Sequence, residues 1–229
     1  MITAVMQPYL FPYLGYFQLI NCSDSFIIYD DVNFIKGGYI NRNYILSNGE
    51  KQRFTIPVPG ASSNTKINEL CYSTDVKKVL ASIQQAYSKA PYFEEVYPLI
   101  EKVLKGKERS ISNVCLQSYV EIFNYLGIRK NFFKSSDLKY DRKKSPAERL
   151  VELTKIFNSN KYVNTIGGKE LYSKDFFKKN GIELSFISSN LPSYVQGSNE
   201  YIAGLSIIDI LMWCEIDAIK DMLNSFSFE

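Results

Sequence analysis

The sequence of 229 residues contains no histidine. Histidine is the side chain that ordinarily changes charge near neutral pH, so an acid–base step in this protein must use Asp, Glu, Lys, Tyr, Cys or the substrate. Cysteine is scarce as well, because the four cysteines lie far apart and form no CxxC pair. This spacing argues against a zinc knuckle and a CxxC redox motif, so no metal site is expected.

Long apolar runs and a strong charge bias are also missing. No segment approaches the ~18 uninterrupted apolar residues of a membrane-spanning helix. The opening stretch MITAVMQPYLFPYLGYF lacks the basic start of a signal peptide and is interrupted by Gln7 and two prolines. The net charge of +3 comes from 27 basic and 24 acidic residues mixed along the chain. We therefore expect a cytoplasmic protein that acts on neither membranes nor nucleic acids.

Apolar and aromatic residues are abundant. Hydrophobic residues make up 45% of the chain, which is enough for one large core, so we expect a single domain over 1–229. The 17 tyrosines and 15 phenylalanines exceed what packing usually requires. Tyrosine suits sugar-binding surfaces as well as cores.

Alternating strand and helix patterns predict an α/β fold, with a mostly parallel sheet and flanking helices. A strand, loop and helix open the chain over 2–20, and SFIIYDD at 25–31 is interpreted as the second strand. A β-rich excursion follows this second strand. Helices at 75–90, 93–105 and 110–126 predict a helical subdomain, or layer, around 75–127.

The second half continues the alternation. Short strands are expected at 131–136, 161–166 and 183–188, and helices at 146–157 and 173–180. Ser145 and Glu148 form a capping-box pattern with proline between them, which marks a helix start. Two helices over 206–226 close the predicted fold.

The segment from Gln7 to Asn43 is the expected place for a small polar substrate, and Gln7 and Tyr9 stand at its start. Gly15 and Tyr16 begin the first predicted helix, where free backbone N–H groups favour a phosphate or carboxylate. The pattern P-x-L-G-Y is similar to the H-x-G-H turn of nucleotidylyltransferase-like folds, although tyrosine and proline replace the histidines. The alternative is that these aromatic residues pack the first helix on the sheet.

Two carboxylates, Asp30 and Asp31, end the second predicted strand, where ligands collect in open α/β sheets. On a continuing strand their side chains point to opposite faces, so only one of them is expected to be functional. It would orient a substrate group, act as a general base or help to hold a metal. The alternative is that both carboxylates are solvated at the strand end.

Cations and glycines follow these acids. Lys36, Asn41 and Arg42 flank or follow the pair Gly37-Gly38 and suit phosphates and sugar hydroxyls. A second polar cluster, Gly167-Gly168-Lys169, lies between a predicted strand and helix and could present backbone N–H groups to an anion. Its alternative is an ordinary glycine turn.

Four motifs carry a resemblance to a known family. QPYLFPYLGYFQLI at 7–20, DSFIIYDDVNFIKGGYINRN at 24–43, SPAERLVEL and LSIIDIL resemble the WbqC-like proteins in the same order over nearly the whole chain. The resemblance implies a bacterial enzyme of O-antigen or other surface-polysaccharide biosynthesis. It further implies transfer of an acyl or aminoacyl group, such as glycyl, to the amine of a nucleotide-linked amino sugar, with a dTDP-sugar favoured.

Two other functions stay open. One is an ATP-dependent ligase that activates the acyl donor, and the other is a non-catalytic module that binds nucleotide-sugars. The donor or activator could be acyl-CoA or ATP, and a homo-oligomer is compatible with the sequence.

Three hypotheses assign roles to residues. Lys36 and Arg42 hold the diphosphate of the substrate. The turn at Gly168 and Lys169 completes the same pocket across the switch point of the sheet. Asp31, or alternatively Asp30, receives the proton of the sugar amine.

Overall fold

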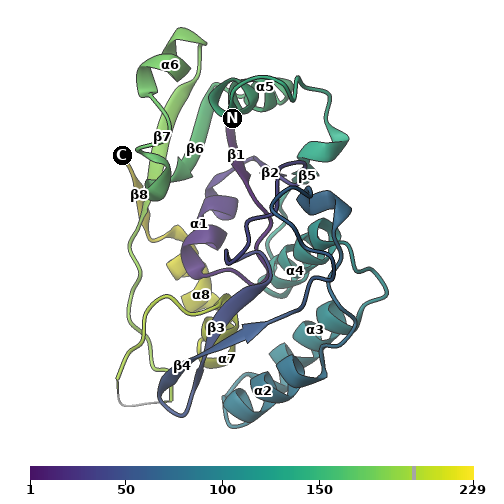
Figure 1. Cartoon of the computed structure of the whole chain (residues 1–229). Helices are drawn as coiled ribbons and strands as arrows, with labels where there is room; N and C mark the ends of the chain where they lie inside the picture. The colour runs from purple at the N-terminus through teal and green to yellow at the C-terminus, as the bar shows by residue number, and fades with distance from the viewer. Residues whose placement is uncertain (198–199) are drawn as a thin grey trace.

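A six-stranded sheet forms the centre of the computed structural model, which describes residues 1–197 and 200–229 (Figure 1). Its strand order is β5-β2-β1-β6-β7-β8. The first five of these pair in parallel and only β8 is antiparallel. Their bounds are β1 (Ile2–Met6), β2 (Ser25–Ile28), β5 (Phe132–Lys134), β6 (Lys161–Thr165), β7 (Glu183–Ser189) and β8 (Phe226–Phe228). The predicted α/β fold with a mostly parallel sheet is confirmed.

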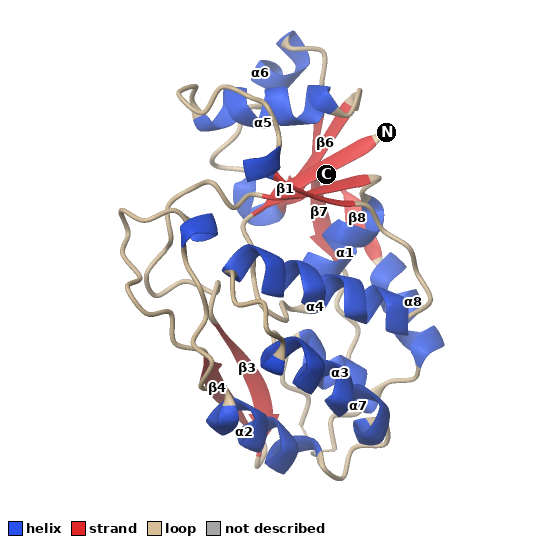
Figure 2. Ribbon diagram, turned by 90° about the vertical axis from the view of Figure 1, so that its right-hand side faces the viewer, coloured by secondary structure: helices blue, strands red, loops and turns tan. Residues whose placement is uncertain are grey.

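Helices cover both faces of this sheet (Figure 2). One face carries α1 (Leu14–Cys22), α4 (Ile111–Tyr125) and α8 (Ile216–Asn224), and the other carries α5 (Pro146–Ile156) and α6 (Lys174–Lys179). Side chains alternate along the strands, as strand geometry requires. Ala4 and Phe26 therefore belong to the core on the α1 side, whereas Val5 and Ile27 belong to the core under α5 and α6.

The remaining elements lie beside the α1 side of the sheet (Figures 1 and 2). The antiparallel pair β3 (Arg42–Ser47) and β4 (Glu50–Thr55) confirms the β-rich excursion after the second strand. The helices α2 (Lys77–Tyr87) and α3 (Phe93–Lys105), with α4, confirm the predicted helical layer, and α7 (Ile207–Trp213) contacts it. Short 3-10 turns occur at η1 (Ile67–Glu69), η2 (Ser135–Asp137) and η3 (Ile166–Gly168).

Two expected elements have different limits. The second strand ends at Ile28, before the two aspartates, because its partners end at Met6 and Lys134 in the same register. The last helix ends at Asn224 instead of 226, since Phe226–Phe228 form β8 and pair with the open edge of β7. The helix start at Ser145 was predicted correctly, because the capping box is present.

The direction of the connections changes at the centre of the sheet. From β1 the chain passes through α1 to β2 on one side, and from β6 it passes through α6 to β7 on the other. The carboxyl ends of β1 and β6 therefore flank a topological switch point, where ligands bind in open α/β sheets.

Candidate active site

The carboxyl ends of three neighbouring strands bring distant polar residues together. Ile28 of β2 is in register with Met6 of β1 and with Lys134 of β5. The residues that follow these strands therefore meet at one edge. They include Gln7 after β1, Asp30 and Asp31 after β2, and Ser135 and Ser136 after β5.

Asp30 and Asp31 are directed to the same serine. The hydroxyl of Ser135 lies 3.1 Å from Oδ1 of Asp30 and 2.5 Å from Oδ1 of Asp31. The prediction that the two side chains point to opposite faces is wrong, because the strand ends before them. The two aspartates are 1% and 6% exposed, so the alternative of solvated carboxylates is excluded as well.

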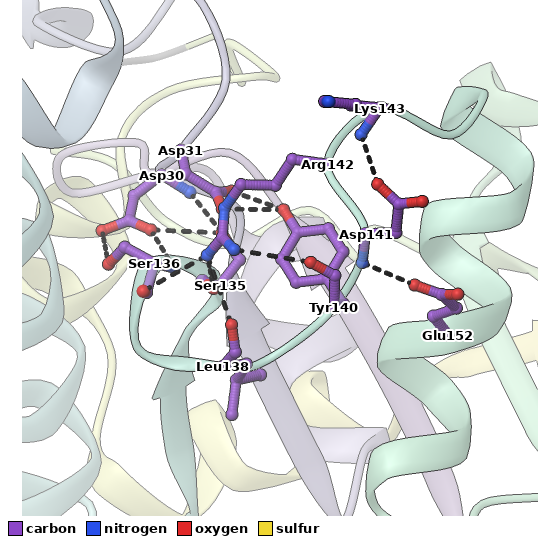
Figure 3. Close-up of polar contacts among 10 residues, drawn as sticks. All are labelled: Asp30, Asp31, Ser135, Ser136, Leu138, Tyr140, Asp141, Arg142, Lys143 and Glu152. Atoms are coloured by element: carbon purple, nitrogen blue, oxygen red, sulfur yellow. Dashed lines mark hydrogen bonds and ion pairs between the residues drawn. The ribbon is translucent and has the colours of Figure 1, made fainter.

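Asp31 accepts hydrogen bonds from three side chains (Figure 3). The hydroxyl of Tyr140 lies 2.7 and 2.8 Å from its two oxygens, and Nε of Arg142 lies 2.6 Å from Oδ2. Arg142 also donates to the carbonyl oxygens of Ser135 and Leu138, at 3.1 and 3.2 Å. The arginine thus fixes the loop from 135 to 142 around the carboxylate.

Asp30 is bound by the start of the same loop. Its Oδ1 accepts from the backbone N–H of Ser136 at 3.0 Å, and its Oδ2 accepts from the Ser136 hydroxyl at 3.0 Å. Its own carbonyl oxygen accepts from the N–H of Asn68 at 2.9 Å. These bonds hold the chain that carries both aspartates, so the carboxylates are positioned before any substrate arrives. The carboxyl-edge cluster denotes Asp30, Asp31, Ser135, Ser136, Tyr140 and Arg142.

The carboxyl-edge cluster can supply both an acceptor and donors. Burial raises the pKa of Tyr140, and its hydrogen bond to the Asp31 carboxylate raises it further, so the phenol stays protonated at neutral pH. The Arg142 side chain is 38% exposed, whereas that of Asp31 is 3% exposed. A polar ligand can therefore approach from the arginine side and find a carboxylate held in fixed orientation.

A second group of polar side chains lies next to this cluster. The guanidinium carbon of Arg149, in the first turn of α5, lies 5.7 Å from the centre of the Tyr29 ring. Burial raises the pKa of Tyr29 to about 12, while Arg149 lowers it and Asp31 raises it. The phenol of Tyr29 is thus near both the Arg149 guanidinium and the Asp31 carboxylate.

Aromatic rings gather around the loop after β1. The Tyr9 ring centre lies 5.4 Å from that of Tyr39 and 6.4 Å from that of Tyr13. The backbone of Tyr9 is fixed, because its N–H donates to the Tyr119 hydroxyl at 2.9 Å and its carbonyl accepts from that hydroxyl at 2.7 Å. Tyr39 is 54% exposed. This aromatic surface suits stacking on a sugar or a base.

Gly15 and Tyr16 lie in the interior instead of facing a ligand. Tyr16 is 2% exposed, and its hydroxyl donates to the carbonyl oxygen of Gln7 at 2.8 Å. The helix start at Gly15 is covered by the Tyr13 ring and by Ser189. These contacts favour the packing alternative for Gly15 and Tyr16 over an anion at this helix start.

Alanine at position 15 is expected to destabilise the fold. A Cβ on Gly15 would lie 2.6 Å from Cε2 of Tyr13 and 2.8 Å from Oγ of Ser189. Overpacking of this kind typically costs about 1–3 kcal/mol. Urea unfolding of Gly15→Ala should show this loss, whereas Gly167→Ala, where a Cβ meets nothing within 4 Å, should stay near wild type. Equal stability of the two variants would contradict the close approach.

The predicted phosphate-binding residues are dispersed over the loop and hairpin that follow. Nδ2 of Asn41 donates to the carbonyl oxygen of Ile56 at 2.8 Å, so this amide stabilises the chain beside β4. Arg42 lies beside Gly37, where a Cβ would be 3.6 Å from its guanidinium. Lys36 is exposed. Within residues 1–197 and 200–229, neither cation has a hydrogen bond or ion pair to the carboxyl-edge cluster.

The glycine turn lies at the carboxyl end of β6. Gly168 is buried, and a Cβ there would lie 3.0 Å from Cγ of Asn164. The ammonium group of Lys169 is paired with the Glu229 carboxylate. Gly168 is therefore close to the switch point, but the charge of Lys169 already has an acidic partner.

A hollow of about 780 Å³ lies elsewhere. It is lined by the amino end of β7, α6 and β8, including Lys161, Lys174 and Glu183. Lys161 pairs with Glu183 at 2.8 Å, and the amino ends of parallel strands are not where ligands collect. We therefore place the candidate active site at the carboxyl-edge cluster.

Four members of that cluster were not predicted from the sequence. Ser135 and Ser136 end a short predicted strand, so the rule that ligands bind at carboxyl ends could have indicated them. Tyr140 and Arg142 lie in the segment KYDRKK, which has the composition of a solvated loop. Nothing local to that segment indicates its contact with Asp31.

No cluster of three or more potential metal-ligating side chains is present in the described part of the chain. The helices described there are also too short or too polar to cross a membrane.

Comparison with known proteins gives one family match and one relative. Residues 7–221 match the model of the WbqC-like protein family. The uncharacterized protein Rv1507c of Mycobacterium tuberculosis is 28% identical over 213 residues, which cover 91% of this chain and 91% of that protein. No solved structure matches the chain significantly.

Proposed function

Because the chain belongs to the WbqC-like protein family, we propose that it is an enzyme of bacterial surface-polysaccharide biosynthesis that acylates a nucleotide-linked amino sugar. The group transferred to the sugar amine is an acyl or aminoacyl group, such as glycyl. The resemblance in the motifs supports this reaction class, and the geometry of the carboxyl-edge cluster supports the position of the chemistry.

One observation carries the proposal: Asp31 is a buried carboxylate held by three donors at the carboxyl end of β2. A sugar amine is largely protonated near neutral pH and cannot attack until it loses a proton. A fixed carboxylate orients the ammonium group, accepts its proton and stabilises the positive charge that develops on nitrogen during attack. The absence of histidine makes a carboxylate the natural base.

The reaction then follows in balanced steps. Asp31 takes one proton from the ammonium group, the neutral amine nitrogen attacks the donor carbonyl carbon, and the bond from that carbon to the donor's leaving group breaks. Asp31 then returns its proton to the leaving group, and the second N–H proton passes to water as the amide forms. Arg142 and Tyr140 position the carboxylate, since both donate to it. The aromatic surface formed by Tyr9, Tyr13 and Tyr39 would contact the base or sugar.

The activity is tested by mass detection of the product. The purified protein is incubated with a deoxythymidine-diphosphate 4-amino sugar and with acyl-CoA donors, or with free amino acids plus ATP. A product with the added acyl mass supports the transferase, and ATP cleavage coupled to product formation identifies the ligase instead. Binding without any product would contradict catalysis and support a nucleotide-sugar-binding module.

Arg42 and Lys36 are retained in the proposal as cations that attract the diphosphate. We expect Arg42→Ala to weaken nucleotide-sugar binding about tenfold to a hundredfold, because a lost charge-assisted contact is worth ~1.5–3 kcal/mol. Titration calorimetry measures this, with the exposed Arg53 of the same hairpin as a matched control in Arg53→Ala. Unchanged affinity in Arg42→Ala and Lys36→Ala would remove both cations from the site.

A further inference from the structure

Within residues 1–197 and 200–229, Tyr29 and Arg149 each carry a buried polar atom without a hydrogen bond of good geometry, although the Tyr140 hydroxyl is near that of Tyr29. These atoms are Oη of Tyr29 and Nε of Arg149. The two residues come from different elements, since Tyr29 follows β2 and Arg149 lies in the first turn of α5. Their side chains nevertheless meet, with the guanidinium carbon 5.7 Å from the Tyr29 ring centre.

Both groups can donate a hydrogen bond, although a tyrosine hydroxyl can also accept one. Arginine has no acceptor atom and keeps its charge at all ordinary pH values. Tyr29 stays protonated at neutral pH, because burial raises its pKa to about 12. Buried polar groups in folded proteins are nearly always hydrogen-bonded. The partner that both donors lack is therefore an acceptor, and beside a permanent cation it is best an anion.

The nearby carboxylate does not fill this role. Asp31 accepts from Ser135, Tyr140 and Arg142, and within the described residues it forms its ion pair with Arg142 rather than with Arg149. Arg149 has no ion pair with any described residue. It is also only partly exposed, so water screens its charge less than that of a surface arginine.

The surroundings of Arg149 extend across the switch point. Burial raises the pKa of the half-buried Tyr172, and the charge of Arg149 opposes that shift. On β6, the Tyr162 hydroxyl accepts from Nδ2 of Asn164 at 3.1 Å. Tyr162 and Asn164 are buried and bonded to each other, so they support this side of the sheet rather than contact a ligand.

We propose that, in addition to Lys36 and Arg42, Arg149 with Tyr29 binds the diphosphate of the nucleotide-linked substrate. This assignment rests on the proposed function for the identity of the anion. The planar fork of arginine matches two phosphate oxygens, and Tyr29 adds a third donor. Tyr29 precedes Asp31 by two residues. A diphosphate bound by Tyr29 and Arg149 would therefore place the attached sugar beside the Asp31 carboxylate.

The test is calorimetric titration of dTDP, without any acyl donor, into the wild type and three variants. Arg149→Ala should weaken dTDP binding about tenfold to a hundredfold, as expected for a lost charge-assisted contact. Arg149→Lys should recover part of the affinity, because it keeps the charge but loses the fork. Tyr29→Phe should cost several-fold. The matched control is Arg129→Ala, since Arg129 is exposed and lies before the amino end of β5.

The outcomes separate this inference from the proposed function. Wild-type dTDP affinity in folded Arg149→Ala, or in Arg149→Lys and Tyr29→Phe if the alanine variant does not fold, would overturn the inference. Arginine-dependent dTDP binding without any acylated product would refute the transferase and leave the diphosphate site supported.

Discussion

Replacing Asp31 with asparagine is expected to lower kcat by about 10²–10⁴-fold, which is the usual cost of losing a general base. Asparagine keeps the size and one acceptor oxygen of the side chain, so it can still bind Tyr140 but cannot take a proton. Turnover in the mass-detected acylation assay measures this effect. Nucleotide affinity should persist, because the diphosphate contacts belong to other residues.

Asp30 is expected to act differently from Asp31. Its carboxylate is bound by Ser136 and is 1% exposed, so Asp30→Asn should mainly lower the free energy of unfolding. Asp137, in the same turn, has a side chain that is 64% exposed and provides the matched control Asp137→Asn. Near-wild-type turnover in both Asp30→Asn and Asp31→Asn would remove the carboxylates from the mechanism.

Replacing Asp209 with alanine is expected to give the largest loss of stability, about 2–4 kcal/mol in the free energy of unfolding. Asp209 is fully buried in the first turn of α7 and accepts from Tyr87 at 2.7 Å, Tyr194 at 2.8 Å and Gln196 at 3.1 Å. Alanine would leave these donors in the interior without their acceptor. Urea unfolding of Asp209→Ala measures the loss.

An exposed aspartate gives the control for this stability prediction. Asp217, in α8, has a side chain that is 90% exposed and pairs with Lys220 at the surface, so Asp217→Ala should change stability little. Similar unfolding curves for Asp209→Ala and Asp217→Ala would contradict the structural role of the buried carboxylate.

The same aspartate gives a pH dependence with a defined sign. Burial raises the pKa of Asp209, and the three donors oppose this shift without cancelling it. The folded protein therefore binds this proton more tightly than the unfolded chain does. Its contribution to stability is fully present below the unfolded pKa and is lost as pH rises through the higher folded pKa. The stability of the wild type relative to Asp209→Asn should fall over that interval, and a rise would contradict the sign.

The parallel sheet was predictable because its strands are short apolar runs separated by turns and amphipathic helices. The limits of individual strands were not, because they depend on partners distant in sequence. β2 ends at Ile28 because β1 and β5 end beside it, and this register cannot be read from SFIIYDD alone. The error at Asp30 and Asp31 follows directly, since alternation was applied to residues beyond the strand.

Only the two aspartates of the candidate site were predicted from the sequence. The aspartates could be identified by their position after an apolar strand, but their partner Ser135 lies 105 residues after Asp30. Arg142 and Arg149 resemble ordinary surface charges in the sequence, and only the tertiary structure distinguishes an arginine paired with Asp31 from one without an acidic partner. Tyr16 is an error in the other direction: it was expected at a ligand site but is buried in the core. The sequence alone does not distinguish a ligand-binding tyrosine from one that packs in the core.

The central claim is that this protein acylates a sugar amine beside Asp31. It is tested most directly by incubating the wild type with an acyl donor and either a dTDP-linked 4-amino sugar or its 4-hydroxy counterpart, with mass detection of the product. We predict rapid formation of the acylated amino sugar, no acylation of the hydroxy sugar, and a loss of about 10²–10⁴-fold in Asp31→Asn. Equal rates for Asp31→Asn and the wild type, or no acylated amino sugar with any donor, would contradict the account.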